Sequence, residues 1–96
     1  MAYTFYVYIM TNKRNNVLYT GRTSGLEGRV YQHKNKIYKG FTYKYNLNRL
    51  IYFEEFESEY ESMLREKQIK GWTRTKKETL IKTINPTWND LAENWF

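Results

Sequence analysis

The sequence contains no cysteine, one histidine and one proline among its 96 residues. Without cysteine it forms no disulfide, thiolate metal site or cysteine nucleophile, and one histidine leaves too few ligands for a closed zinc site. The longest apolar run, residues 5–10, has six residues, whereas a helix needs about 20 to span a bilayer. The N-terminus also lacks the layout of a signal peptide. We therefore expect a soluble cytoplasmic domain that does not enter a membrane.

The length and composition are those of one small globular domain, which we expect to occupy residues 1–96. Hydrophobic residues make up 41% and charged residues 27%, a balance typical of a folded chain. Aromatic residues are frequent at 19%, with ten tyrosines. Because buried tyrosines need partners for their hydroxyl groups, this content predicts a polar network or a stacking surface beside the core.

Charge is unevenly distributed along the chain. Sixteen basic and ten acidic residues give a net charge of +6, and residues 1–53 hold nine bases and one acid. Residues 54–61 hold five acids and no base. A basic surface indicates an anionic partner, and nucleic acid is the commonest large polyanion. The alternative is that the charge serves solubility alone.

The first half of the chain has the pattern of a hairpin followed by a helix. The expected elements are a strand over 5–10, a polar turn over 11–16, and a returning strand over 17–21. Ser24 and Glu27 have capping-box spacing, so a helix should begin there and end near residue 34. Residues 35–46 form a basic, aromatic loop whose structure the sequence leaves open.

The second half predicts one more strand and two helices. The strand is expected over 49–56, and Ser58 with Glu61 has capping-box spacing for a helix that stops near Gly71. The next helix, starting at residue 75, should bury three apolar side chains: Leu80, Ile81 and Ile84.

The proline marks the end of the last long helix. Asn85 and Pro86 should end it, and a short turn is expected at 88–91 with Asn85 as its cap. The element order is therefore β-β-α-β-α-α. It predicts an α+β fold in which helices flank a three-stranded antiparallel sheet.

Five residues stand out because a packed core alone does not need them. Tyr8 and Tyr19 lie on adjacent strands, where a tight hairpin can bring them together on one face. Arg29 and His33 are four apart and share a helix face. Glu66 is at the edge of an apolar helix face, where a carboxylate meets solvent, a cation or a metal.

The order and spacing of these residues resembles the GIY-YIG nuclease superfamily, and more narrowly its small single-domain endonuclease branch. The motifs are Tyr6-Val7-Tyr8, Tyr19-Thr20-Gly21, Arg29, His33, Glu66 and Asn85, and the stretches 28–34, 65–72 and 85–88 are similar to that branch as well. Tyr6 stands where the family name has glycine and Thr20 where it has isoleucine. The resemblance covers about residues 3–90 and implies a GIY-YIG-like fold and metal-dependent hydrolysis of phosphodiester bonds in DNA.

The resemblance suggests a role for each matched position. Tyr19 would help to deprotonate the attacking water, Tyr8 would hold that water or the scissile phosphate, and Arg29 would neutralise the phosphate. Glu66 would ligate one Mg²⁺ or Mn²⁺ ion. Asn85 would shape the end of the active site.

His33 and Arg22 match positions where relatives place a supporting base or a cation. A free tyrosine has a pKa near 10, so about 0.1% is phenolate at pH 7, and neighbouring cations favour the phenolate. Neutral His33 is an alternative proton acceptor. Since general-base help contributes only about 10²–10⁴-fold, charge stabilisation has to supply most of the catalysis.

Basic and aromatic residues alternate after the first expected helix. The basic ones are Lys34, Lys36, Lys39 and Lys44, and the aromatic ones are Tyr38, Phe41, Tyr43 and Tyr45. This mixture suits phosphate contacts and base stacking. Together with Arg22, these lysines are the expected nucleic-acid-binding residues.

Other interpretations of the same residues remain open. Tyr8 and Tyr19 can form a cross-strand aromatic pair, Glu66 can pair with Lys70 on the helix surface, and Asn85 can be a cap alone. The main alternative function is a non-catalytic basic module that binds nucleic acid. A protein-interaction domain that uses the acidic stretch and the C-terminal Trp95-Phe96 is a further alternative, supported by little beyond charge.

Overall fold

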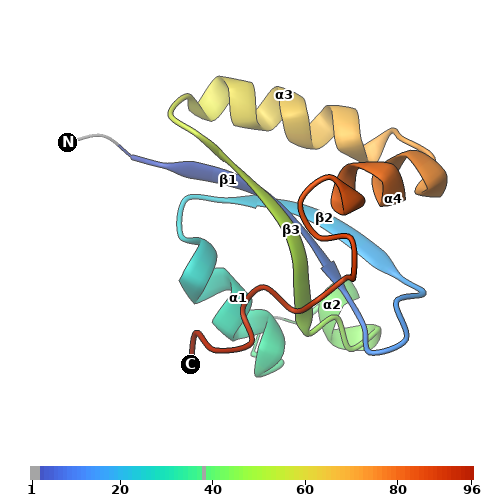
Figure 1. The fold of residues 1–96 in the computed structure, drawn as a ribbon. Helices are drawn as coiled ribbons and strands as arrows, with labels where there is room; N and C mark the ends of the chain where they lie inside the picture. The colour runs from blue at the N-terminus through green and yellow to red at the C-terminus, as the bar shows by residue number, and fades with distance from the viewer. Residues whose placement is uncertain (1–2, 38) are drawn as a thin grey trace.

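The structure, a computed structural model, describes residues 3–37 and 39–96. In chain order, its elements are β1 (Phe5–Thr11), β2 (Leu18–Thr23), α1 (Leu26–Lys34), α2 (Phe41–Lys44), β3 (Arg49–Phe56), α3 (Glu59–Lys70) and α4 (Arg74–Lys82). The sheet is antiparallel with strand order β2-β1-β3. Helices α3 and α4 lie on one side of this sheet and α1 and α2 on the other (Figure 1). The predicted α+β fold is confirmed, with α2 as an additional short helix.

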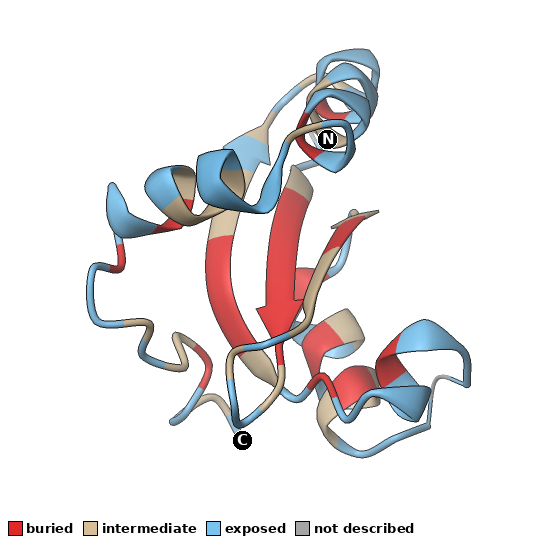
Figure 2. Cartoon of the chain, turned by 90° about the vertical axis from the view of Figure 1, so that its right-hand side faces the viewer, coloured by how far each residue is buried: buried red, intermediate tan, exposed pale blue. Residues whose placement is uncertain are grey.

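The central strand β1 is buried on both faces because its side chains alternate between two cores. Tyr8 and Met10 pack with α1 in one apolar cluster, and Val7 and Ile9 pack with residues of α3 and α4 in the other. The buried residues accordingly concentrate in the middle of the strands (Figure 2). Within residues 3–37 and 39–96, no helix is long and apolar enough to cross a bilayer.

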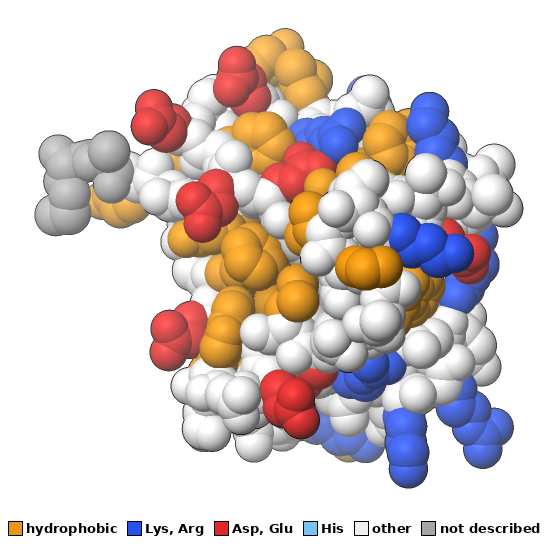
Figure 3. All heavy atoms as spheres, viewed as in Figure 1, with side chains coloured by type: hydrophobic (Ala, Val, Ile, Leu, Met, Phe, Trp, Pro, Cys, Tyr) orange, Lys and Arg blue, Asp and Glu red, His pale blue; other side chains and the backbone are white. Residues whose placement is uncertain are grey.

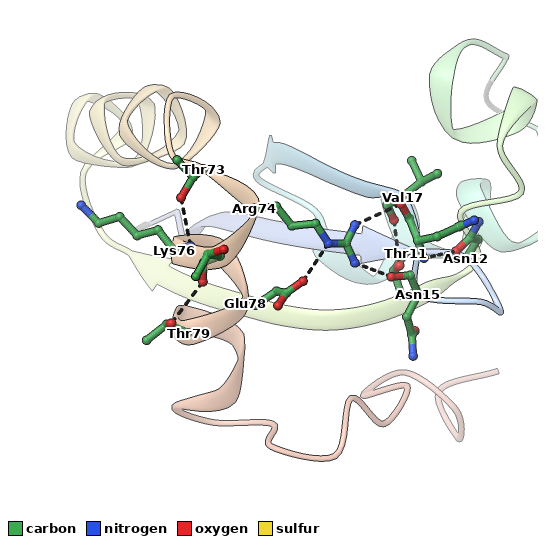
Figure 4. Close-up of polar contacts among 11 residues, drawn as sticks. Thr11, Asn12, Asn15, Val17, Thr73, Arg74, Lys76, Glu78 and Thr79 are labelled. Carbon is green, nitrogen blue, oxygen red and sulfur yellow. Dashed lines mark hydrogen bonds and ion pairs between the residues drawn. The ribbon is translucent and has the colours of Figure 1, made fainter.

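The β1–β2 turn is fixed by side chains from two elements. Thr11 Oγ1 donates to the carbonyl of Val17 across the turn at 2.7 Å. From the other side, the guanidinium of Arg74 at the start of α4 donates to the carbonyls of Asn15 and Asn16, the latter at 3.0 Å (Figure 4). The hairpin that carries both tyrosine motifs is therefore tied to the last helix.

The two predicted capping boxes have different outcomes. Ser58 caps α3 as expected, because its Oγ accepts from the backbone N–H of Glu61 at 3.2 Å. The prediction for Ser24 is wrong: α1 begins at Leu26 with Gly25 as its N-cap and no side-chain cap. The Thr23 hydroxyl accepts from the Gly25 N–H instead, at 3.0 Å. This local turn competes with the cap that Ser24 would form.

Three further expectations about the C-terminal part are corrected. Helix α4 begins at Arg74, since Thr73 rather than Thr75 is the cap, with its Oγ1 accepting from the Lys76 N–H at 3.2 Å. Ile84 lies beyond the end of α4 and is 54% exposed, not buried. The turn expected at 88–91 lies at 85–88 instead: the Trp88 N–H donates to the Asn85 carbonyl at 3.1 Å, the Asn89 N–H donates to Asn85 Oδ1 at 2.9 Å, and the positive φ of Trp88, 56°, ends the turn.

Candidate active site

The two tyrosines of the motifs meet over a glycine. Tyr8 pairs with Gly21 across the β1–β2 ladder, and the rings of Tyr8 and Tyr19 lie 6.3 Å apart. A Cβ atom at Gly21 would come within 2.5 Å of Tyr8 Cζ and Oη and within 2.9 Å of Tyr19 Cε2. The second motif therefore requires glycine because both phenol rings occupy the space above its backbone.

The hydroxyl of Tyr8 contacts the single histidine. Tyr8 Oη and His33 Nε2 are 3.0 Å apart, and His33 Nδ1 lies 2.9 Å from Thr42 Oγ1 of α2. Tyr8 is 0%, His33 2% and Thr42 3% exposed. These three side chains form a buried chain of hydrogen-bonding groups, which we call the Tyr8–His33–Thr42 chain.

The environment of His33 keeps its imidazole neutral. Burial, followed by the positive charge of Arg29, lowers the pKa of His33 from 6.5 to about 4. At neutral pH one ring nitrogen therefore carries a proton and the other is an acceptor. The ring also lies 6.0 Å from the ring of Tyr19, so His33 is adjacent to both phenols.

Arg29 joins the same cluster from α1. It precedes His33 by one helical turn, is partly buried, and is close enough to lower the pKa of His33. Four residues expected at the site therefore lie on the side of the sheet that α1 covers: Tyr8, Tyr19, Arg29 and His33.

Glu66 approaches the sheet from the opposite side. It lies on α3, and its carboxylate is 3.6 Å from Arg22 Nε and 3.1 Å from Lys70 Nζ. Arg22 is on β2 but alternates with Tyr19 and Gly21, so it points to the α3 side. Edge strand β2 therefore lies between Glu66 and the tyrosine cluster.

The donor set around Glu66 fits a hydrated divalent cation better than a caged one. The described part of the chain has no group of three or more His, Cys, Asp or Glu side chains that could hold a metal. Mg²⁺ commonly uses one or two carboxylates and keeps several waters. Thr20, two positions from Arg22 on the same face of β2, is 4% exposed, and its Oγ1 has no hydrogen-bond partner.

Asn85 has a structural set of contacts. Its side-chain amide donates to the carbonyls of Ile51 in β3 and Asn89, at 2.9 and 2.8 Å, and its Oδ1 accepts from the Asn89 N–H at 2.9 Å. Ile51 is at the bulge where the β1–β3 register shifts, which leaves its carbonyl available for this contact. Asn85 thus holds the C-terminal segment to β3.

The lysines at the end of α1 and after it have different surroundings. Lys34 forms an ion pair with Asp90, whereas Lys36 and Lys44 lie over the rings of Tyr43 and Tyr45. Lys39 is exposed, and Tyr38 lies outside the described residues. In the view of Figure 3, Lys and Arg side chains gather on the right and lower sides and most acidic ones on the left. The charge separation seen in the sequence therefore persists on the folded surface.

Two contributors to the site were missed by sequence reasoning. Thr42 lies 2.9 Å from His33 Nδ1, and Phe41 stacks on Tyr19 with ring centroids 5.9 Å apart. Both come from α2, within the stretch whose structure the sequence left open. Phe41 was considered only as a stacking residue for nucleic acid, and no spacing rule marked Thr42.

The chain is a small α+β domain whose paired tyrosines, arginine and histidine form a cluster able to bind a phosphate and move a proton. The chain belongs to the GIY-YIG family, because the sequence profile of the GIY-YIG catalytic domain matches residues 4–79. This confirms the resemblance seen in the sequence. The family is one of nucleases, which act on nucleic acid and generally use a divalent metal.

The chain is also similar to small proteins named UPF0213. One from Clostridium perfringens is 42% identical over 76 residues, covering 79% of this chain and 81% of the relative. One from Natronomonas pharaonis is 38% identical over 85 residues, covering 84% and 94%. The solution NMR structure of a UPF0213 protein from Bacillus halodurans matches with a TM-score of 0.59 and 27% identity, over 95% of this chain and 97% of that one.

Proposed function

We propose that this protein is a metal-dependent endonuclease that hydrolyses phosphodiester bonds in DNA. The observation that carries the proposal is the cluster of Tyr8, Tyr19, Arg29 and His33 around Gly21, in a chain that belongs to a nuclease family. The basic surface supports a polyanionic substrate.

In this proposal the phenols and His33 handle the proton of the attacking water. Tyr19 is partly exposed and is the phenol that substrate or water reaches. The 3.0 Å contact favours Tyr8 as the phenol whose proton His33 accepts. The low pKa of His33 keeps its imidazole unprotonated and so able to accept a proton, but it also makes the imidazole a weak base. A phosphodiester bound to Arg29 would neutralise the positive charge of Arg29, which is one cause of the low His33 pKa.

Charge stabilisation is assigned to Arg29, Arg22 and Glu66. The planar guanidinium of Arg29 suits two phosphate oxygens, and Arg22 Nε is buried without a hydrogen-bond partner. Glu66 would hold one Mg²⁺ or Mn²⁺ ion at the β2 edge. That ion would stabilise the negative charge that develops on the phosphate.

In this proposal, substrate reaches the cluster from the side of Tyr19, which is partly exposed. Phe41 stacks on Tyr19 and is itself 48% exposed. Turning the Phe41 side chain outward would uncover this phenol while Thr42 stays against His33.

A non-catalytic module that binds nucleic acid is the second candidate. It is favoured by the burial of Tyr8 and His33 and by the ion pairs of Glu66 with Arg22 and Lys70. In that case the tyrosine cluster would serve packing, and the lysines near α2 would bind phosphates without cleavage.

A cleavage assay separates the two functions. Purified protein is incubated with supercoiled, nicked and branched DNA, and with RNA, in Mg²⁺, Mn²⁺ or EDTA. We expect metal-dependent DNA cleavage that is lost in EDTA and in Arg29→Ala and Glu66→Ala, while Glu66→Ala still binds DNA. Glu78→Ala is the matched control, since Glu78 is also a helical glutamate paired with a basic residue, Arg74. Cutting that persists in EDTA and in both variants would indicate a contaminant and favour the binding module.

A further inference from the structure

Helix α2 turns one side chain inward, and that side chain is polar. Thr42 is 3% exposed, whereas its neighbours Phe41, Tyr43 and Lys44 are exposed. Valine would fill the same volume without a hydroxyl group to satisfy, and an unpaired buried hydroxyl costs free energy. The contact of Thr42 Oγ1 with His33 Nδ1 at 2.9 Å is therefore what favours threonine at this position.

The backbone on each side of Thr42 holds it in place. Gly40 precedes α2 with φ 134° and ψ −148°, a conformation that is open almost only to glycine. After α2, the Leu47 N–H donates to the Thr42 carbonyl at 2.9 Å, and Leu47 is buried in the core with Tyr8. Backbone constraints before and after Thr42 thus hold its hydroxyl against His33.

A neutral imidazole has one N–H, and two proton arrangements satisfy both contacts of His33. In one, Nδ1–H donates to Thr42 Oγ1 and Nε2 accepts from the Tyr8 hydroxyl. In the other, Nε2–H donates to Tyr8 and the Thr42 hydroxyl donates to Nδ1. Only the first arrangement leaves a lone pair on Nε2 to receive the Tyr8 proton.

We propose that Thr42 is a positioning residue whose hydroxyl accepts from the Nδ1–H of His33 and so leaves the Nε2 lone pair directed at Tyr8, an inference that rests on the nuclease function proposed above. In the reacting state the Tyr8 proton moves from Oη to Nε2, which leaves a phenolate and an imidazolium. The imidazolium keeps its Nδ1–H on Thr42 Oγ1, so the same contact stabilises the charged product of the transfer.

Among the described residues, groups from four elements lie beside His33. Arg29 lies on its own helix, Tyr8 and Tyr19 lie on β1 and β2, and Thr42 comes from α2. Within this set, Thr42 is the partner of Nδ1, so its removal changes the tautomer balance while the charges around the ring stay the same.

Nitrogen NMR tests the tautomer directly, because His33 is the only histidine and its ring signals need no assignment among several. At pH 7 the wild-type protein should show a protonated Nδ1 and an unprotonated Nε2. In Thr42→Val the two forms should exchange or reverse, and Thr42→Ser should restore the wild-type pattern. A wild-type protein with its proton on Nε2 would overturn the proposal whatever the variants do.

Kinetics supply the second readout, on whichever DNA form the wild-type protein cleaves. We expect kcat of Thr42→Val to fall about 10- to 100-fold with KM nearly unchanged, and Thr42→Ser to stay close to wild type. Equal activity of Thr42→Val and wild type would overturn the proposal while the nuclease function stands. A wild-type protein that has the proposed tautomer, lost in Thr42→Val, but cleaves no DNA would instead overturn the nuclease function and leave the positioning role of Thr42 established.

Discussion

Gly21 and Tyr8 face each other across the hairpin, and no atom larger than hydrogen fits on the Gly21 Cα beneath the phenol. A Cβ atom at Gly21 would lie only 2.5 Å from Tyr8 Cζ and Oη, and Tyr8 is fully buried. The ring therefore cannot move aside without disturbing its contact with His33.

We predict that Gly21→Ala destabilises the protein by about 1–3 kcal/mol, as overpacking in a core does, and reduces cleavage by displacing Tyr8. Urea denaturation and the cleavage assay measure the two effects. Gly28→Ala is the control, because no heavy atom lies within 4 Å of its added Cβ and alanine favours a helix. We expect that control to be neutral or stabilising by up to about 1 kcal/mol. A Gly21→Ala protein as stable as Gly28→Ala would contradict the geometry.

The buried His33 should make stability depend on pH. Its pKa is about 4 in the folded chain and 6.5 as a free side chain, so the unfolded chain binds more protons between these values. Stability is therefore fully present above about pH 6.5 and is lost as the pH falls toward 4, by on the order of 3 kcal/mol. Urea denaturation of wild type and His33→Gln between pH 4.5 and 7.5 isolates this effect. Parallel pH curves for the two proteins would show that His33 does not contribute.

The exposed lysines around α2 should contribute to nucleic-acid binding through phosphate contacts. We predict that Lys39→Ala/Lys44→Ala weakens DNA binding and makes the salt dependence of affinity shallower by about one unit per lysine. Fluorescence anisotropy of a labelled duplex over a KCl series provides the measurement. Lys67→Ala/Lys82→Ala removes the same charge from exposed positions on α3 and α4 and should leave the slope unchanged. Equal effects of both double variants would mean that net charge alone governs binding.

The two serines with capping-box spacing should differ in their effect on stability. Ser58→Ala should cost about 1 kcal/mol because it removes the hydroxyl that accepts from the Glu61 N–H. Ser24→Ala should change the free energy of unfolding by less than about 0.5 kcal/mol, since α1 has no side-chain cap. Thermal or urea denaturation of the pair is sufficient. Similar losses in both variants would contradict the assignment of Gly25 as the α1 cap.

Strong local patterns made much of the fold predictable. The run of β-branched and aromatic residues in β1 and β3, and the Ser58 cap, act over neighbouring residues, so the sequence placed β3 at 49–56 and began α3 after Ser58 correctly. Errors arose where two local signals compete. Near α1, the Thr23 hydroxyl forms a local turn with the Gly25 N–H instead of the cap expected from Ser24, and near α4, Thr73 rather than Thr75 provides the cap.

Part of the candidate site could also be predicted from the sequence. Strand alternation and helical periodicity are enough to place Tyr8 beside Tyr19 and Arg29 beside His33, and the contacts around Gly21 agree with that grouping. Sequence spacing says nothing about which face of the sheet a later helix covers. The position of Glu66 on the α3 side, beside Arg22, therefore required coordinates.

The chain's order of motifs determined its family and the identity of the phenols, guanidinium and carboxylate available for chemistry. Folding decided which of these groups touch: it buried Tyr8, gave it His33 as a partner, and brought Thr42 to the far side of that imidazole. The physical reason is that hydrogen bonds and burial depend on approach in space. Residues 8, 33 and 42 become neighbours only after the sheet, α1 and α2 have packed together.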